Sequence, residues 1–173
     1  MAAAVELCES NESTGESITH NVTNLNWGTV DEANTDYANH PVTAGQNAMF
    51  KLERIHLTAL NGSNKIDNIQ IWKSAGNYVT DESIKSVLHT VQGNYDTYKV
   101  TAYSQPNTTT MSGYAMPIAD PGSPNLGIGG SLTGSLTAAG SYSDYWKWQT
   151  QTLGTTPPGN TNQKTMTLQY DEQ

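Results

Sequence analysis

Apolar and polar residues alternate along much of the sequence, and this period of two predicts β-strands. The strongest pattern lies at residues 47–72, where two such runs flank the pair Asn61-Gly62. Asn-Gly favours a type I′ turn, because both central residues of that turn need positive φ. The sequence therefore predicts a central β-hairpin, whose second arm turns Ile69 and Ile71 towards the core.

The first arm of this hairpin departs from strict alternation. Phe50 and Leu52 fall on one side of a regular strand, whereas Ile55 and Leu57 fall on the other. One extra residue near positions 53–54 would bring all four side chains to the same face. We therefore expect a β-bulge there, which would bend the strand towards a second sheet.

Alternation also predicts an edge strand at residues 18–27 and strands at residues 96–103 and 111–118. A final hairpin is expected to start at residues 145–152 and to return along residues 164–170, after a Pro-Pro-Gly-Asn connection. These strands would complete the sheets that the central hairpin begins.

One segment has the spacing of a helix. Thr80-Asp81-Glu82 is typical of a helix N-terminus with early acids. Apolar residues follow at the i, i+3, i+4 and i+7 positions, namely Ile84, Val87, Leu88 and Val91. A short helix is expected here, with a strand as the alternative, because Val and Thr are β-branched.

Composition supports an all-β fold, since the polar residues are mainly Thr, Ser, Asn and Gln, which favour strands and turns. We predict an antiparallel β-sandwich, jelly-roll-like, with long loops and at most one short helix. Residues 1–17 show no apolar period and predict a flexible N-terminal arm. Residues 18–173 would form a single domain, long enough to fold without disulfides or metals.

Charge narrows the possible partners. Asp and Glu outnumber Lys and Arg by 16 to 8, so no nucleic acid partner is expected. No run approaches the roughly 20 apolar residues that cross a bilayer, so no membrane partner is expected either. The first residues lack the basic and apolar regions of a signal peptide, which predicts synthesis in the cytoplasm.

The sequence contains no spacing typical of a metal site. The four histidines never form a zinc-binding pair: His20, His40, His56 and His89. Cys8 is the only cysteine, and we expect a free structural or incidental thiol rather than a nucleophile. The loop at residues 28–45 carries three acids whose spacing does not match a calcium loop: Asp31, Glu32 and Asp36.

No catalytic or cofactor-binding residue is predicted, and no cofactor. Paired acids occur only as direct neighbours, which point to opposite faces of a strand or splay on a loop: Asp31-Glu32, Asp81-Glu82 and Asp171-Glu172. A glycosidase pair drawn from distant strands stays unsupported. Gly127-x-Gly129 lacks the third glycine and the following helix of a dinucleotide loop.

The tryptophans allow two interpretations. Trp146 and Trp148 share one face of a predicted strand, so we expect them in the core, with stacking on sugar rings as the alternative. Trp72 is expected to pack under a loop or at a subunit contact, with a ligand platform as the alternative.

Several stretches, in this order, carry a family resemblance: Asn24-Leu-Asn-Trp-Gly, Pro41-Val-Thr-Ala-Gly-Gln-Asn with Lys51, Ile66-Asp-Asn-Ile-Gln-Ile-Trp, Ser143-Asp-Tyr-Trp-Lys-Trp-Gln-Thr-Gln and Gln169-Tyr-Asp-Glu. Residues 20–173 thereby resemble virion structural proteins of tailed bacteriophages, especially capsid decoration or cement proteins. The resemblance implies a non-enzymatic β-sandwich located on the virion. It would form a homo-oligomer, bind the major capsid protein and bridge neighbouring capsid subunits.

A carbohydrate-binding β-sandwich, on a phage tail tip or as a lectin, is the alternative from another functional class. Such a module would use Trp27, Trp72 or an exposed tyrosine as a platform for a sugar ring.

Overall fold

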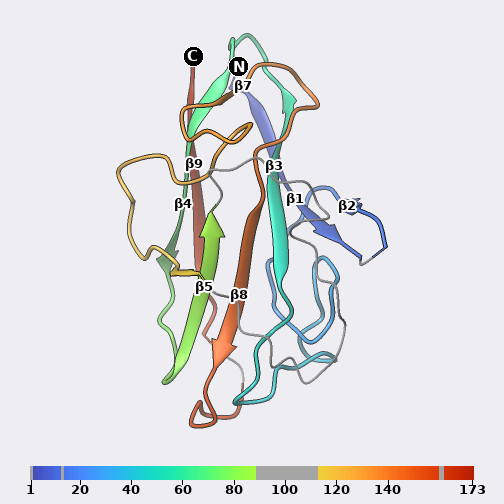
Figure 1. The fold of residues 1–173 in the computed structure, drawn as a ribbon, viewed down its shortest axis with the longest axis vertical. Helices are drawn as coiled ribbons and strands as arrows, with labels where there is room; N and C mark the ends of the chain where they lie inside the picture. Colours follow the sequence, from blue (N-terminus) through green and yellow to red (C-terminus); the bar gives the residue numbers. More distant parts are fainter. Residues whose placement is uncertain (1, 13, 89–112, 160–161) are drawn as a thin grey trace.

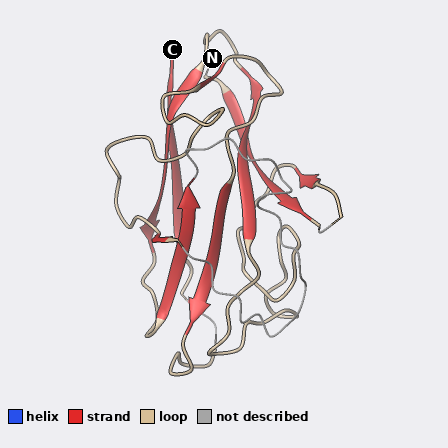
Figure 2. Cartoon of the chain, in the orientation of Figure 1, coloured by secondary structure: helices blue, strands red, loops and turns tan. Residues whose placement is uncertain are grey.

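The computed structural model describes residues 2–12, 14–88, 113–159 and 162–173, and the strands formed by these residues lie in two antiparallel sheets (Figures 1 and 2). The strands are β1 (Ala4–Asn11), β2 (Ser17–Thr19), β3 (Lys51–Ala59), β4 (Ile66–Ala75), β5 (Glu82–Leu88), β6 (Tyr114–Ala115), β7 (Ser135–Leu136), β8 (Trp146–Thr152) and β9 (Thr165–Glu172). The described part of the chain contains no helix, and hence no helix that could cross a membrane.

The larger sheet has six strands in the order β2-β1-β3-β8-β5-β6, and the smaller has three in the order β7-β4-β9. Neighbouring strands within both sheets pair antiparallel, as the ladder of seven residue pairs between β5 and β8 illustrates. The prediction of an all-β antiparallel sandwich with long loops is therefore confirmed.

A single main core lies between the two sheets. Its largest fully buried side chains come mainly from β3, β4, β5 and β8: Ile55, Leu57, Ile66, Ile69, Ile71, Ile84 and Trp148. The rings of Trp146 and Trp148 pack with their centroids 4.1 Å apart in this core. The inward placement of Ile69, Ile71 and both tryptophans agrees with the alternation in the sequence.

The predicted central hairpin is wrong, although both of its strands exist. β3 pairs with β1 and β8, whereas β4 pairs with β7 and β9, so the connection crosses from one sheet to the other. Asn61 and Gly62 have the expected positive φ, 53° and 106°. The two strands lie in different layers because both apolar faces point into one core, and face-to-face stacking buries both of them.

The predicted final hairpin is wrong for the same reason. β8 lies between β3 and β5 in the larger sheet, and β9 pairs with β4 in the smaller one. The connection between β8 and β9 therefore also crosses between the layers.

The bulge predicted in β3 does not form. β3 pairs with β1 without interruption from Leu57 to Glu53, so strict alternation holds along this stretch. Ile55 and Leu57 face the main core, while Leu52 packs with Tyr145 in a separate small cluster. Lys51 and Glu53 occupy the inward positions that the bulge would have given to apolar residues.

Three further segments differ from expectation. The N-terminal segment expected to be an arm contains β1, whose Val5 and Leu7 pack against the core. The predicted strand at residues 18–27 shortens to β2, which does form a sheet edge. The segment expected to be a helix is the strand β5, which was the alternative, and it pairs with β8. Its alternate residues Glu82, Ile84 and Ser86 are buried, as the period of two in a strand requires.

The structure describes only part of the remaining predicted strands. Residues 96–103 and His89 lie outside the described residues. Within the predicted strand at residues 111–118, the structure places β6, which pairs with β5.

Gly76→Ala should be strongly destabilising. Gly76 follows β4 with φ of 83°, and a Cβ atom there would overlap the carbonyl oxygen of Gln163. Left-handed strain and overpacking together should lower the free energy of unfolding by about 2–5 kcal/mol, measured by chemical denaturation.

Gly140→Ala is the matched control, because Gly140 has φ of 88° but a Cβ atom added there would meet no other atom within 4 Å. Its free energy of unfolding should fall only by the cost of the left-handed backbone conformation, about 1–2 kcal/mol. Equal losses in the two variants would contradict a steric contact at Gly76.

Candidate functional site

Polar residues gather on both faces of the β1–β3 pair. On β1 and β3, alternate residues turn to opposite faces of the larger sheet. Glu9, Lys51 and Glu53 lie on the inner face and are buried, whereas Glu6 and Cys8 lie on the outer face with His56. The two faces therefore present two distinct candidate sites.

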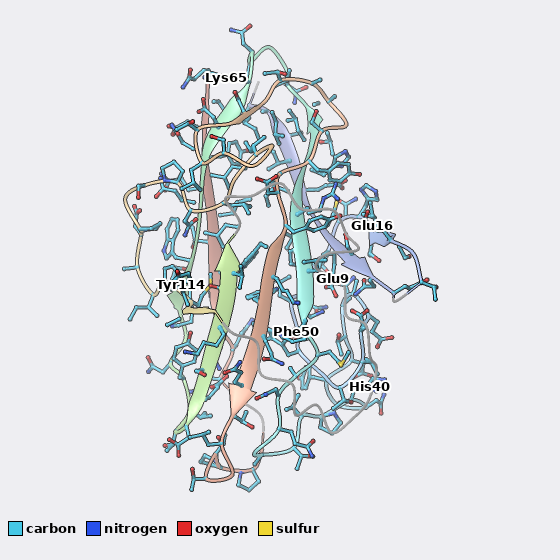
Figure 3. The ribbon with its side chains drawn as sticks, viewed as in Figure 1. Glu9, Glu16, His40, Phe50, Lys65 and Tyr114 are labelled. Carbon is cyan, nitrogen blue, oxygen red and sulfur yellow. The ribbon has the colours of Figure 1, made fainter. Side chains whose placement is uncertain are left out.

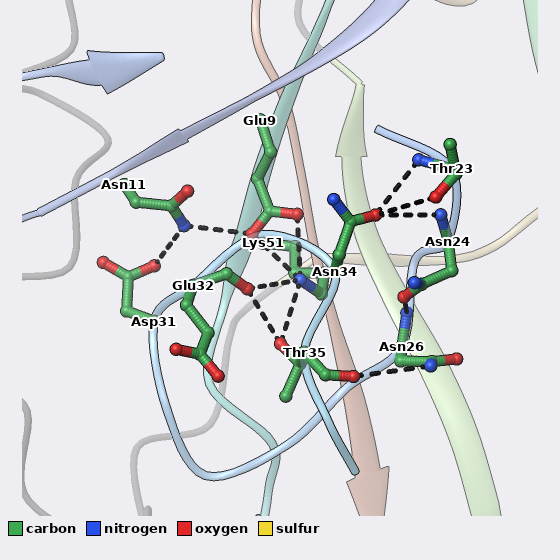
Figure 4. A network of polar contacts seen from close by, with 10 residues as sticks. All are labelled: Glu9, Asn11, Thr23, Asn24, Asn26, Asp31, Glu32, Asn34, Thr35 and Lys51. Carbon is green, nitrogen blue, oxygen red and sulfur yellow. Dashed lines mark hydrogen bonds and ion pairs between the residues drawn. The ribbon is translucent and has the colours of Figure 1, made fainter. Parts of the chain in front are cut away.

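The inner-face cluster is centred on a buried ion pair. Lys51 Nζ lies 2.9 Å from both carboxylate oxygens of Glu9, and the two side chains are only 3% and 1% exposed. Asn11 Nδ2 donates to Glu9 Oε1 at 2.9 Å, and Lys51 also donates to the carbonyl oxygen of Glu32 at 3.2 Å (Figure 4). Charged groups this deeply buried are stabilised by pairing and hydrogen bonding.

The loop between β2 and β3 covers this cluster and is held by its own polar contacts (Figure 4). Asn34 Oδ1 accepts hydrogen bonds from the backbone nitrogens of Thr23 and Asn24, at 3.1 and 3.2 Å. Asp31 accepts a hydrogen bond from Asn11 Nδ2 at 2.9 Å. Asp36 accepts hydrogen bonds from Ala38 and Asn39 within the loop, so two of the acids considered for calcium, Asp31 and Asp36, hold the loop in place.

Glu53 adds a second acid to the inner-face cluster. Its side chain is fully buried, and its carboxyl oxygens have no hydrogen-bond partner among the described residues. Burial, and after it the negative charge of Glu9, raises the pKa of Glu53 well above its usual value of 4.5. Lys51 pairs with the carboxylate of Glu9, so Glu53 is the acid of this cluster whose neutral form is favoured by its surroundings.

The outer-face cluster consists of Glu6, Cys8, His20 and His56. Glu6 Oε1 lies 2.6 Å from Nδ1 of His20 and 2.5 Å from Nδ1 of His56. Cys8 Sγ lies 3.4 Å from His20 Nδ1 and 3.8 Å from Glu6 Oε1. All four potential ligand atoms lie within 4.8 Å of one another.

Aromatic and charged side chains border the outer-face cluster. Tyr142 stacks on His56 with ring centroids 4.4 Å apart, and the Arg54 guanidinium lies 4.3 Å from the Tyr142 ring centroid. Arg54 also contacts Glu16 at 3.2 Å, and Tyr145 donates to the same carboxylate at 2.7 Å. Figure 3 locates Glu16 beside β2, at one end of the larger sheet.

The protonation of the outer-face cluster argues against a nucleophilic role. Cys8 is fully buried, and burial raises the pKa of its thiol to about 12, with a smaller effect from the charge of Glu6. Hydrogen bonds from His56 and His20 lower the pKa of Glu6. At neutral pH the cluster thus holds a carboxylate and an unreactive thiol, which agrees with Cys8 as a structural thiol.

None of the cluster residues was predicted as a site residue from the sequence. His40 is not part of the cluster and lies 3.9 Å from Glu32 in the covering loop. The one local signal is that Glu6 and Cys8, two residues apart, share a face of a strand. His56 could be assigned to the cluster only once the pairing of β1 with β3 was known, because that pairing places His56 of β3 opposite Glu6 of β1.

The tryptophans considered as sugar platforms lie in packed positions. Trp72 is 9% exposed, and Trp146 and Trp148 are 2% and 0% exposed. Trp27 packs edge-on against Trp148, with ring centroids 4.4 Å apart. Exposed aromatic rings among the described residues are instead those of Tyr37 and Tyr114.

Comparison with known proteins finds no matching family model, no similar curated protein and no similar solved structure.

Glu53→Gln should stabilise the protein at pH 8. The folded-state pKa of Glu53 is raised, so its contribution favours folding below about pH 4.5 and is lost as the pH rises towards the raised pKa. Within that window, each rise of one pH unit lowers the free energy of unfolding by about 1.4 kcal/mol. The neutral amide of the Glu53→Gln variant avoids this loss. Thermal unfolding should show a higher Tm than the parent at pH 8 and a smaller difference at pH 4.

Glu9→Gln is the matched control, because it makes the same change at the acid that pairs with Lys51. It should lower the Tm at pH 8, since it removes the partner of a buried charge. A comparable loss of Tm at pH 8 in Glu53→Gln would mean that Glu53 is ionised.

Proposed function

We propose that this chain is a non-enzymatic structural protein of a tailed-bacteriophage virion. It binds the outer shell of the capsid through the major capsid protein and stabilises the shell by bridging neighbouring subunits. The observation that carries this proposal is the open edge of β9, and the family resemblance described above supports it.

The edges of the two sheets differ greatly in length. β2, β6 and β7 have only three, two and two residues, whereas β9 has eight. Short strands protect a sheet edge from unwanted pairing, as do lysine and proline within the strand. β9 is long, contains neither lysine nor proline, and pairs only with β4 among the described residues.

Contacts of β4 show which of its backbone groups face β9. The carbonyl oxygen of Ile69 accepts a hydrogen bond from the backbone nitrogen of Asn125 at 3.0 Å, and Lys73 donates to the carbonyl oxygen of Pro117 at 2.8 Å. These groups of β4 therefore point away from β9. The direction of the backbone N–H and C=O groups alternates from residue to residue along a strand. The backbone groups of Gln70 and Trp72 therefore point towards β9.

The register then identifies the open groups of β9. Gln70 and Trp72 lie opposite Gln169 and Thr167, which therefore direct their backbone groups to β4. The alternate residues of β9 direct their N–H and C=O groups to the open edge: Met166, Leu168 and Tyr170. Their side chains pack against the main core and are half-buried, so an added strand would also cover apolar surface.

Strand addition at β9 explains how a small protein could bind a shell. Backbone hydrogen bonds give affinity in this mode, and the side chains along the edge give specificity. A ligand selective for the assembled shell stabilises that state by mass action. Many copies, and oligomers of the chain, would raise the effective concentration at the shell.

The structure gives the carbohydrate-binding alternative less support. Its platforms were to be Trp27, Trp72 or an exposed tyrosine, but Trp72 is buried and Trp27 is half-buried with its ring against Trp148. Tyr37 and Tyr114 are exposed but lie on separate segments, the covering loop and β6.

Rate-zonal sedimentation of a native lysate from the source, followed by mass spectrometry, tests the proposal directly. The chain should migrate with a large particle in a fixed ratio to the major capsid protein. Recovery only in the slow fractions would contradict the capsid role, and a glycan array would then test sugar binding. Decorated shells should also withstand heat better than shells stripped of this chain.

Leu168→Pro should weaken binding to stripped shells by tenfold or more, equivalent to about 1.4 kcal/mol. Proline removes the Leu168 N–H from the open edge and places a ring there, while the ladder to β4 does not use that N–H. Binding is measured by co-sedimentation over a range of concentrations, after circular dichroism has confirmed the fold.

Leu168→Ala is the matched control, because it loses the same side-chain packing but keeps the N–H group. It should be less stable than the parent yet bind shells with similar affinity. Equal binding by the proline and alanine variants would show that the β9 edge is not the docking site.

A further inference from the structure

The outer-face cluster has the composition of a transition-metal site. It brings together one thiol, two imidazoles and one carboxylate, each offering one ligand atom within 4.8 Å of the others. Zn²⁺ is commonly bound by four such side chains in tetrahedral geometry. Calcium and magnesium prefer oxygen ligands only, so the sulfur and nitrogen atoms favour Zn²⁺.

The sheet fixes three of the four side chains. Glu6 lies directly opposite His56 in the β1–β3 ladder. Cys8 is two residues beyond Glu6, so its side chain emerges on the same face of β1. Ligands on paired strands hold their positions more accurately than ligands on loops.

His20 completes the set from the segment that follows β2. This segment is tied to β1 by a hydrogen bond from the Val22 backbone nitrogen to the Leu7 carbonyl oxygen, at 3.0 Å. The His20 side chain is 45% exposed, whereas that of His56 is 14% exposed. His20 therefore provides both the solvent-facing ligand and the route by which an ion would enter.

The distances fit a metal after small movements. Zn–S bonds of about 2.3 Å and Zn–N or Zn–O bonds of about 2.0–2.2 Å place tetrahedral ligand atoms roughly 3.3–3.6 Å apart. The Cys8–His20 separation of 3.4 Å already meets this spacing, and the Cys8–Glu6 separation of 3.8 Å is close to it. The two histidine–Glu6 contacts would lengthen by roughly 0.7–1.1 Å to admit an ion.

The charges of the ligands also suit a divalent ion. On binding Zn²⁺ the Cys8 thiol would release its proton to solvent, and the resulting thiolate and the Glu6 carboxylate would together neutralise the ion, with two neutral imidazoles completing the shell. Arg54 lies opposite Cys8 in the ladder, but its guanidinium is directed to Glu16 and Tyr145. The guanidinium of Arg54 is thus partnered by groups outside the proposed site.

We propose that Glu6, Cys8, His20 and His56 bind one Zn²⁺ ion, which fastens the segment after β2 to the β1–β3 ladder. All four ligands come from the protein, as in structural zinc sites, where no position remains open for a substrate. Tyr142 covers the His56 ring and shields that side of the site. The inference does not depend on the capsid role, because it involves a different edge from β9.

The first experiment uses the full chain, purified under reducing conditions, stripped with a chelator, loaded with Zn²⁺ and passed through gel filtration. Elemental analysis should find one zinc ion per chain, and bound zinc should raise the Tm. Co²⁺ in place of Zn²⁺ should give the visible bands of a tetrahedral ion and a thiolate-to-metal charge-transfer band. No retained zinc, or a Co²⁺ spectrum without the charge-transfer band, would overturn the proposal.

Ligand variants identify the residues. Cys8→Ser and His20→Asn should each weaken zinc binding, in competition with a chelator, by more than the roughly 10–100-fold that loss of an outer-shell partner costs. Both should also lose the zinc-dependent rise in Tm. The His20 side chain is 45% exposed, so His20→Asn gives the result even if the buried Cys8→Ser variant does not fold.

His40→Asn is the matched control, since it removes a histidine that lies in the covering loop near Glu32. It should bind zinc and gain stability from it as the parent does. If His20→Asn retains as much zinc as His40→Asn, the ion binds elsewhere and the proposed site is wrong.

Discussion

The fold depends on how the charge of Lys51 is accommodated in the interior. An unpaired ammonium group would be very costly there, so Lys51 requires Glu9 beside it, and the pair fixes the register of β1 against β3. The same ammonium group bonds the Glu32 carbonyl oxygen, which holds the covering loop on the sheet. A buried ion pair adds little net stability, but its partners leave few alternative arrangements of these segments.

This pair divides the inner face of the larger sheet into two parts. Where β3 carries Ile55 and Leu57, the smaller sheet covers it and forms the apolar core. Where β3 carries Lys51 and Glu53, the covering element is a loop, whose carbonyl and side-chain groups can satisfy buried polar atoms. The apolar part provides most of the burial energy, and the polar part determines which segments lie together.

The sequence predicts strands well because alternation depends on neighbouring residues, but it does not predict which strands pair. Asn61-Gly62 adopts the backbone expected of a tight turn and still connects two layers, since local turn geometry does not decide which sheet the next strand joins. The bulge prediction fails because it gives the inward positions of β3 to apolar residues, whereas Lys51 and Glu53 occupy them. The outer-face cluster was missed because His56 meets Glu6 only through the β1–β3 register, across long sequence separations.

The β2 edge of the larger sheet and the β9 edge of the smaller sheet differ in how their strands are covered. At the β2 edge, the strand is short and polar side chains bind the neighbouring segment to β1 and β3, so an added strand would have to displace existing contacts. At the β9 edge, three residues direct their backbone groups outward, and no other described segment pairs with them. If a strand of the capsid adds at β9, as proposed, each copy of the chain docks in the same orientation. That restriction is what a protein needs if many copies are to bind a symmetric shell in the same way.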